Sequence, residues 1–205
     1  MKKLEIPNQE QVWNNIAPEW HRHKEKPLKN VKEFLKNSQG KILDFGSGSG
    51  RHLIKFNNKK REYYLVDFSF EMIKLAEQKS KKLGINAKFK VADLTNLPYE
   101  NNFFDFSICV SAIHCIPKEK NRKKAISEMY RVLKPSGKAY IGVWNIKSKR
   151  FRNKRPERLI GWTNKGKRYY HLYTKDEIEK ELKEIGFKIL EDKSSEMMIN
   201  FVVEK

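Results

Sequence analysis

Residues 42–50 read Ile-Leu-Asp-Phe-Gly-Ser-Gly-Ser-Gly, an apolar run that passes directly into three glycines at alternate positions. The run is typical of a buried strand, and glycines in the following turn let a ligand approach the backbone closely. We expect this turn to lead into a helix. The spacing is G-x-G-x-G, and Arg51 stands where a dinucleotide-binding fingerprint has glycine or alanine, which argues against NAD.

Short β-rich runs alternate with amphipathic helices after this motif. Strands are predicted at 41–45, 63–66, 88–91, 104–110 and 139–144. Helices are predicted at 69–83, with Ser69 as the N-cap and Gly84 as the stop, and at 118–133. This alternation predicts a doubly wound α/β fold in which helices cover a mostly parallel sheet.

The two ends of the chain have patterns of their own. The first forty residues carry two apolar helical stripes that are separated near Pro27. Near the C-terminus, Thr174 and Glu177 form a capping box at the start of a helix that Gly186 ends, and strands at 187–191 and 197–203 close the fold as a hairpin. We therefore predict a single domain with four parts: an N-terminal helical lid (1–39), a cofactor-binding core (40–145), a basic substrate-facing segment (146–173), and a closing helix and strands (174–205).

The composition limits the class of protein. The N-terminal residues carry lysines but are not followed by the apolar core of a signal peptide, and no stretch approaches membrane-spanning length, so we expect a cytoplasmic protein without a membrane partner. Cys109 and Cys115 form no CxxC pair, so we expect reduced thiols and no metal site.

Carboxylates follow three predicted strands. Asp67 lies 21 residues after Gly46, a spacing at which an acidic side chain can accept both hydroxyls of a ribose. Asp93 ends the next strand and could accept from an adenine amino group, and Asp44 could meet a cationic amino group of the ligand. Each aspartate alone could be a helix cap or a turn residue, but three at one sheet edge favour a ligand site.

The core motifs resemble class I S-adenosylmethionine-dependent methyltransferases over residues 40–145. The resemblance rests on 43–50 (LDFGSGSG), 66–69 (VDFS), Ala92-Asp93, Leu97-Pro98, Phe104-Asp105 and 131–137 (RVLKPSG), in that order. It implies S-adenosyl-L-methionine as cofactor and a Rossmann-like, seven-stranded, mostly parallel sheet whose last strand is antiparallel. The cofactor-binding residues are then expected to be Asp44, Gly46, Ser47, Gly48, Gly50, Asp67, Phe68, Asp93 and Leu94.

The flanking motifs resemble a narrower group, the tRNA methyltransferases that esterify 5-carboxymethyluridine at the wobble position. These motifs are 12–20 (VWNNIAPEW), Ala112-Ile113-His114, Gly161-Trp162 and 168–173 (RYYHLY). The chain departs from that pattern at Lys24, Leu28 and Gly161, where arginine, tryptophan and proline are usual. The resemblance implies binding to the tRNA anticodon region and, in some cases, a small zinc-binding activator subunit.

A carboxylate acceptor is ionised at neutral pH and needs alignment more than proton transfer. We expect His114, Arg168, Tyr169 and His171 to hold such an acceptor in line, without assigning an obligatory base. Substrate contacts are expected from Trp20, Lys24, Lys26, Trp162 and Tyr170. The alternatives are a strand-end turn for His114 and core packing for the tyrosines.

Positive charge is large and clustered. Lys and Arg number 44 against 25 Asp and Glu, a net charge of +19, and residues 147–175 hold eleven Lys or Arg against Glu157 alone. Cations interleaved with aromatic rings suit unstacked RNA, although a solvated loop is the alternative. Two other functions stay open: a methyltransferase for a small-molecule acid or hydroxyl, and a non-catalytic RNA-binding subunit.

Overall fold

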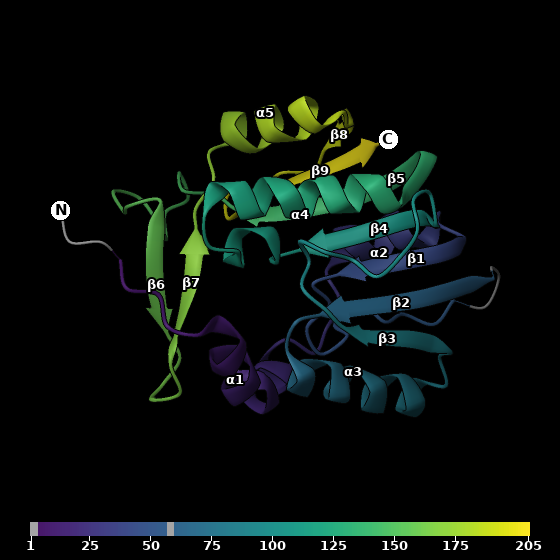
Figure 1. Ribbon diagram of the computed structural model, residues 1–205, viewed down its shortest axis with the longest axis horizontal. Helices are drawn as coiled ribbons and strands as arrows, with labels where there is room; N and C mark the ends of the chain where they lie inside the picture. The colour runs from purple at the N-terminus through teal and green to yellow at the C-terminus, as the bar shows by residue number, and fades with distance from the viewer. Residues whose placement is uncertain (1–3, 57–59) are drawn as a thin grey trace.

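A seven-stranded sheet forms the centre of the molecule (Figure 1). The computed structural model describes residues 4–56 and 60–205, so residues 1–3 of the predicted lid lie outside the described part of the chain. The sheet strands are β1 (Gly40–Phe45), β2 (Arg61–Asp67), β3 (Ala87–Val91), β4 (Phe104–Val110), β5 (Leu133–Trp144), β8 (Lys188–Asp192) and β9 (Met198–Glu204). The helices are α1 (Gln9–His23), α2 (Lys29–Lys36), α3 (Phe70–Leu83), η1 (Ile113–Cys115), α4 (Glu119–Val132) and α5 (Lys175–Ile185).

The strand order is β3-β2-β1-β4-β5-β9-β8, with β1 to β5 parallel and β9 antiparallel to both of its neighbours. The predicted doubly wound sheet with an antiparallel strand from the closing hairpin is therefore confirmed. The chain reverses its direction of travel across the sheet between β1 and β4, which opens a crevice at the carboxyl ends of these strands.

Side chains alternate between two cores along each strand. Leu43 and Phe45 are fully buried in a cluster that includes residues of α4 and α5, whereas Ile42 lies in a second cluster with Val31 and Leu35 of α2. Helices therefore cover both faces of the sheet, as Figure 1 shows. No helix in the described ranges is long and apolar enough to cross a membrane.

The predicted helix ends are confirmed. The Ser69 hydroxyl accepts a hydrogen bond from the Met72 N–H, and Gly84 ends α3 at a φ of 61°. Thr174 and Glu177 form the reciprocal capping box of α5. The two N-terminal apolar stripes correspond to α1 and α2, which are separated at residues 24–28.

The helix expected after the glycine turn is absent from residues 46–56, the described residues that directly follow β1. Residues 46–52 adopt turns, and residues 53–56 have irregular backbone. Gly46, Gly48 and Gly50 all have positive φ values, and only ten residues separate Gly50 from the start of β2 at Arg61. Because the glycines in the first part of this connection are held at positive φ, the right-handed dihedrals of an α-helix cannot begin there.

The basic segment contains an antiparallel hairpin that was not predicted. Strands β6 (Glu157–Gly161) and β7 (Lys167–His171) form a separate two-stranded sheet. Figure 1 shows this hairpin beyond the carboxyl ends of the parallel strands, next to α1. The segment expected to face the substrate is thus built as a wall opposite the crevice.

Candidate functional site

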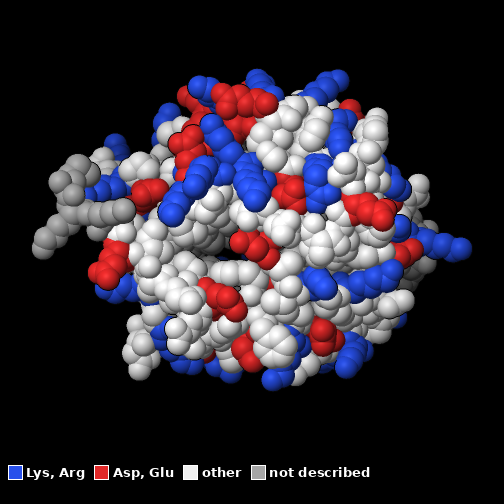
Figure 2. Space-filling model, in the orientation of Figure 1, with Lys and Arg blue, Asp and Glu red and all other residues white. Residues whose placement is uncertain are grey.

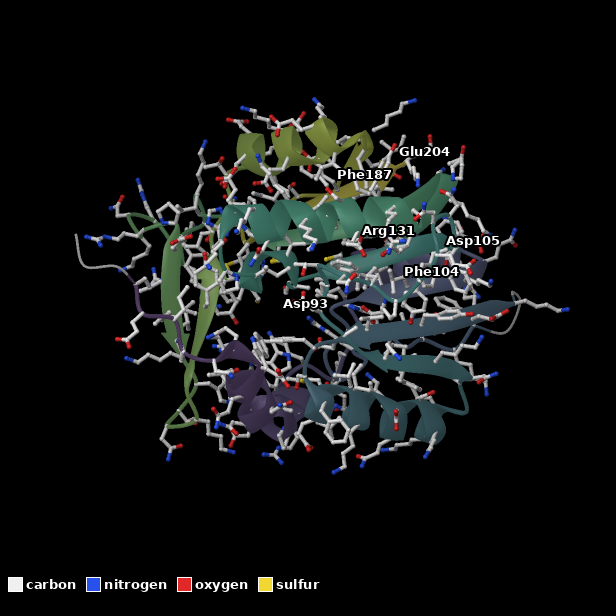
Figure 3. All side chains as sticks on the ribbon, in the orientation of Figure 1. Asp93, Phe104, Asp105, Arg131, Phe187 and Glu204 are labelled. Carbon is white, nitrogen blue, oxygen red and sulfur yellow. The ribbon has the colours of Figure 1, made fainter. Side chains whose placement is uncertain are left out.

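A pocket lies between the carboxyl edge of the sheet, α1 and the hairpin. The strand ends supply Gly46, Asp67, Asp93 and Ser111, while α1 supplies Trp13 and Trp20. Figure 3 labels Asp93 beside this opening, whereas Asp105 and Arg131 lie at the opposite end of the sheet. The pocket therefore occupies the crevice that the strand order creates.

The floor of the pocket is the glycine turn. The backbone N–H groups of Gly46 and Ser47 both donate to the Val66 carbonyl, at 2.9 and 3.0 Å, which joins the turn to the end of β2. A Cβ on Gly46 would lie 2.3 Å from the Ala112 Cβ, so only glycine fits there. Gly46, Ser47 and Gly48 line the pocket, whereas Gly50 packs beneath it against Leu53 and Ala76.

Asp67 braces the turn. One carboxylate oxygen accepts from the Gly48 N–H at 2.8 Å and the other from the Ser69 N–H at 3.0 Å. Burial raises the pKa of Asp67 to about 6, so this carboxyl is ionised at neutral pH. Each oxygen retains a lone pair that a ligand hydroxyl could use.

Asp93 lines the pocket from an exposed turn, where its side chain accepts from the Thr95 N–H at 2.8 Å. Phe68 and Leu94, also predicted for the cofactor, line the same pocket. The structure thus brings Gly46, Ser47, Gly48, Asp67, Phe68, Asp93 and Leu94 together.

Asp44 is buried just before the turn, one residue from the end of β1, and unlike the other predicted carboxylates it does not line the pocket itself. One of its oxygens has no hydrogen-bond partner within the described residues. Burial, reinforced by the charge of Asp67, raises the pKa of Asp44 to about 8. A buried carboxyl with an unused oxygen next to a glycine-lined floor fits a ligand that carries a cationic amino group, as S-adenosylmethionine does.

Replacing Asp44 with asparagine should stabilise the ligand-free protein at alkaline pH and weaken cofactor binding. Because the folded pKa of Asp44 lies above its ordinary value of 3.8, its stabilising contribution is present at low pH and is lost as the pH rises towards 8. Asparagine avoids that loss, so its advantage in Tm should grow between pH 5 and 8.5, at about 2–4 °C per kcal/mol. Thermal melts at both pH values measure the change in stability, and calorimetry with S-adenosylhomocysteine measures cofactor binding. A difference in Tm between the two proteins that stays constant from pH 5 to 8.5 would contradict the raised pKa of Asp44.

Arg168 of β7 is a buried cation behind the hairpin wall, which faces the glycine turn across the pocket. The Arg168 guanidinium donates to the Tyr170 hydroxyl at 2.6 Å and lies 5.0–5.8 Å from the ring centroids of Trp13, Trp20, Trp162 and Tyr170. Arg168 is only 4% exposed, and within residues 4–56 and 60–205 no carboxylate forms a salt bridge with it. Its bond to Tyr170 leaves the Tyr170 hydrogen free to donate into the pocket.

Three further cations line the pocket, namely Lys24, Arg51 and Arg150. Burial lowers the pKa of Lys24, and the charges of Arg51, Arg150 and Arg168 lower it further. Unlike Lys165, which pairs with Glu19 at 2.7 Å, none of the three forms a salt bridge in the described part of the chain. Such mutual repulsion without a compensating carboxylate favours an anionic ligand at this end of the pocket.

His114 is fully buried and does not line the pocket. Its Nδ1 accepts from the Trp144 N–H at 3.1 Å, and its ring lies against Trp144 and Tyr170. Burial lowers the pKa of His114 to about 3, so the imidazole is neutral. His114 is therefore suited to position the rings of Trp144 and Tyr170, and it is not suited to bring a positive charge to the acceptor.

Tyr169 and His171 lie on the other face of β7 from Tyr170, because neighbouring strand residues point in opposite directions. The Tyr169 hydroxyl donates to Glu157 at 2.7 Å, and His171 Nε2 lies 2.6 Å from Glu177. Neither residue lines the pocket. We call the part of the pocket lined by Lys24, Arg150 and Tyr170 the acceptor end. The structure does not bring Tyr169 and His171, two of the predicted catalytic residues, to this end.

Only some of the predicted substrate-contact residues line the pocket. Trp20, Lys24 and Tyr170 line the pocket, whereas Lys26 is exposed outside it and accepts from Arg51 through its carbonyl. Trp162 lies against Trp20 at 5.4 Å and donates to Glu19 at 2.7 Å, so it supports the wall from behind.

Four prominent pocket residues were not predicted, namely Arg51, His52, Trp144 and Arg150. Arg51 and His52 enter because the chain continues as a turn after the glycines. Trp144 ends β5 and so stands at the carboxyl edge, a position that its place in a predicted strand could have indicated. Arg150 stacks over Trp144 at 5.0 Å, a contact that has no local sequence signal.

Comparison with known proteins finds similar methyltransferases in both sequence and fold. A family model described as a methyltransferase domain matches residues 42–137. The tRNA (carboxymethyluridine(34)-5-O)-methyltransferase of Arabidopsis thaliana is 35% identical over 135 residues, which cover 65% of this chain and 31% of that protein. Its counterpart in Schizosaccharomyces pombe is 28% identical over 213 residues, covering 88% and 89%. A ubiquinone/menaquinone biosynthesis C-methyltransferase of Rickettsia akari is 38% identical over 117 residues, covering 52% and 46%.

The chain thus spans about a third of the Arabidopsis relative and most of the fission yeast one. Among solved structures, a SAM-dependent methyltransferase of Methanosarcina mazei superposes with a TM-score of 0.73 at 22% identity, covering 87% of this chain and 98% of that one. A complex of the Haloferax volcanii Trm112 methyltransferase activator with a putative methyltransferase gives 0.73 at 15% identity, covering 98% and 99%. Residues 42–137 thus match a methyltransferase domain, the fold is shared with S-adenosylmethionine-dependent methyltransferases of known structure, and the sequence resembles the tRNA carboxymethyluridine methyltransferases.

Proposed function

We propose that the protein transfers a methyl group from S-adenosylmethionine to the carboxylate of 5-carboxymethyluridine at the tRNA wobble position. The observation that carries this proposal is the charge of the acceptor end, where Lys24, Arg51 and Arg150 line the pocket and Arg168 is buried behind Tyr170, without a salt bridge to any of the four among the described residues. An acceptor that is itself an anion would compensate these cations.

The residues of the two ends would then have separate roles. Asp67 would accept from the ribose hydroxyls, Asp93 from the adenine amino group, and Asp44 would face the amino group of the cofactor. At the other end Tyr170, polarised by Arg168, would donate to one oxygen of the acceptor carboxylate. Bound S-adenosylmethionine supplies an electrophilic methyl group on a sulfonium.

The reaction needs no general base. The free oxygen of the acceptor carboxylate attacks the methyl carbon, a C–O bond forms, and the C–S bond breaks with its electron pair remaining on sulfur. The pocket would contribute alignment and the exclusion of water, because the acceptor is already ionised at neutral pH. The neutral His114 is consistent with this scheme, since no proton has to be removed.

The direct test is methyl transfer from labelled S-adenosylmethionine to tRNA that carries 5-carboxymethyluridine, followed by nucleoside analysis. The experiment should be run with and without a candidate activator subunit, because the similar Haloferax volcanii structure holds such a subunit. We expect the methyl ester at position 34. Demonstrated cofactor binding without transfer in either mixture would contradict the proposal.

A second candidate is methylation of a small molecule, which is favoured by the similarity to the Rickettsia akari C-methyltransferase over 117 residues. A small acceptor predicts activity that hardly depends on salt and no affinity for tRNA. The clustered positive charge at 147–175 favours the RNA acceptor instead. We propose that the reaction takes place in the cytoplasm.

The predicted lid has a structural basis in Glu19 of α1. Its carboxylate accepts from the Trp162 indole N–H at 2.7 Å and pairs with Lys165 at 2.7 Å, so it joins α1 to the tip of the β6–β7 hairpin. We infer that α1 and the hairpin close the acceptor end as one unit, with the cofactor end formed by the core.

A further inference from the structure

A second cationic surface lies on the hairpin, outside the pocket. Lys154, Arg155, Arg158 and Lys167 line a shallow groove along β6 and the turn that precedes it. We call these four residues the hairpin strip. Among the described residues that line the groove, Glu157 is the only acidic one, and its side chain accepts from the Tyr169 hydroxyl.

The hairpin strip differs in its pairing from the lysines of α4 and α5 that face glutamates. On α4 and α5 several lysines pair with acidic residues, as in Lys123–Glu119 and Lys183–Glu179, and Figure 2 shows the two charges side by side over this region. Within the described residues, no member of the strip forms a salt bridge. Cations gathered without acidic partners cost free energy through mutual repulsion unless an anion binds them.

The strip continues from the pocket. Arg150 lines the pocket and Lys154 lines the groove, and four residues of chain span at most about 14 Å. A ligand whose one end reaches the acceptor site could therefore place further negative charges over the groove. A single-stranded nucleic acid has this form, since an extruded base enters the pocket while the neighbouring phosphates follow a charged surface.

We propose that the hairpin strip binds the phosphates that flank the target nucleotide of an RNA. This inference rests on the proposed function for the identity of the RNA, but the surface itself needs only a phosphate backbone. Arg158 and Arg155 suit phosphate oxygens through their paired N–H groups, and the lysines add point charges.

The test is binding of an unmodified RNA stem–loop to the chain of 205 residues, which requires no methyl transfer. The variant Lys154→Ala/Arg155→Ala removes two charges from the strip, and Lys180→Ala/Lys183→Ala removes the same charge from α5. Loss of two phosphate contacts should lower the slope of log Kd against log salt by about 1.4 and weaken binding about tenfold at 150 mM salt. The α5 variant should bind as the unaltered protein does.

Equal weakening in both variants would assign the effect to net charge and overturn the proposal, as would unchanged binding in the strip variant. Displacement of the RNA by an acidic peptide of matched charge at the same concentration would also overturn it, because the surface would then serve an acidic protein. The outcome is independent of the proposed reaction: a strip that binds RNA in a protein that forms no methyl ester separates the two proposals.

Discussion

Replacing Arg168 with alanine should lower kcat/KM for carboxymethylated tRNA by roughly 30- to 800-fold, or about 2–4 kcal/mol, and leave cofactor affinity nearly unchanged. Arg168 holds the Tyr170 hydroxyl at 2.6 Å and supplies a buried positive charge behind it. Without that charge, Tyr170 is a weaker donor and the acceptor carboxylate loses its fixed position. Steady-state kinetics with tRNA and calorimetry with S-adenosylhomocysteine measure the two quantities.

The alanine variant could also lose stability, because Arg168 fills a space among four aromatic rings. The variant Arg168→Met is the matched control, since methionine keeps much of the volume and removes the charge. We expect its activity to fall as far as that of the alanine variant, while Arg168→Lys retains part of it. Full activity in Arg168→Met, or equal losses of cofactor binding and transfer, would show that Arg168 is a packing residue.

Sequence patterns were sufficient for the part of the site that follows regular strand ends. Asp67 and Asp93 could be placed at one edge because parallel strands bring their carboxyl ends together, and the glycine spacing marked the floor. The prediction of a helix after the glycines was wrong. It was made because a strand followed by a glycine-rich turn usually leads into a helix. In the structure β2 begins at Arg61, two residues before the predicted strand, and residues 46–52 stay in turns, so the sequence alone did not reveal how little of this connection is left for a helix.

The acceptor wall was harder to predict, because its strand character was hidden by its basic composition. Once 167–171 is known to be a strand, its period of two separates Arg168 and Tyr170 from Tyr169 and His171. Without that knowledge, all four residues were assigned to the site, three of them as catalytic residues and Tyr170 as a substrate contact. Arg150 could not be assigned at all, since its place over Trp144 depends on tertiary packing.

Replacing Asp67 with alanine should weaken cofactor binding by about 1.5–3 kcal/mol, roughly 10- to 150-fold, through the loss of charge-assisted hydrogen bonds. The effect has two sources. Asp67 would no longer accept from the ribose, and the Gly48 and Ser69 N–H groups that it now holds would lose their acceptor. Calorimetry with S-adenosylhomocysteine at pH 7.5 measures the loss, and binding of an RNA stem–loop in the same protein provides the control, because the hairpin strip lies away from Asp67.

The pH dependence separates the charge from the shape of this side chain. The raised pKa of Asp67, about 6, means that the carboxylate is protonated in part below pH 6 and ionised above it. Ligand hydroxyls that donate to Asp67 favour the ionised form, so cofactor affinity should rise between pH 5 and 7 in the unaltered protein. The variant Asp67→Asn keeps the shape without the titration and should show a smaller rise. An affinity for S-adenosylhomocysteine that is unchanged in both variants would remove Asp67 from the cofactor site and leave it as a brace for the turn.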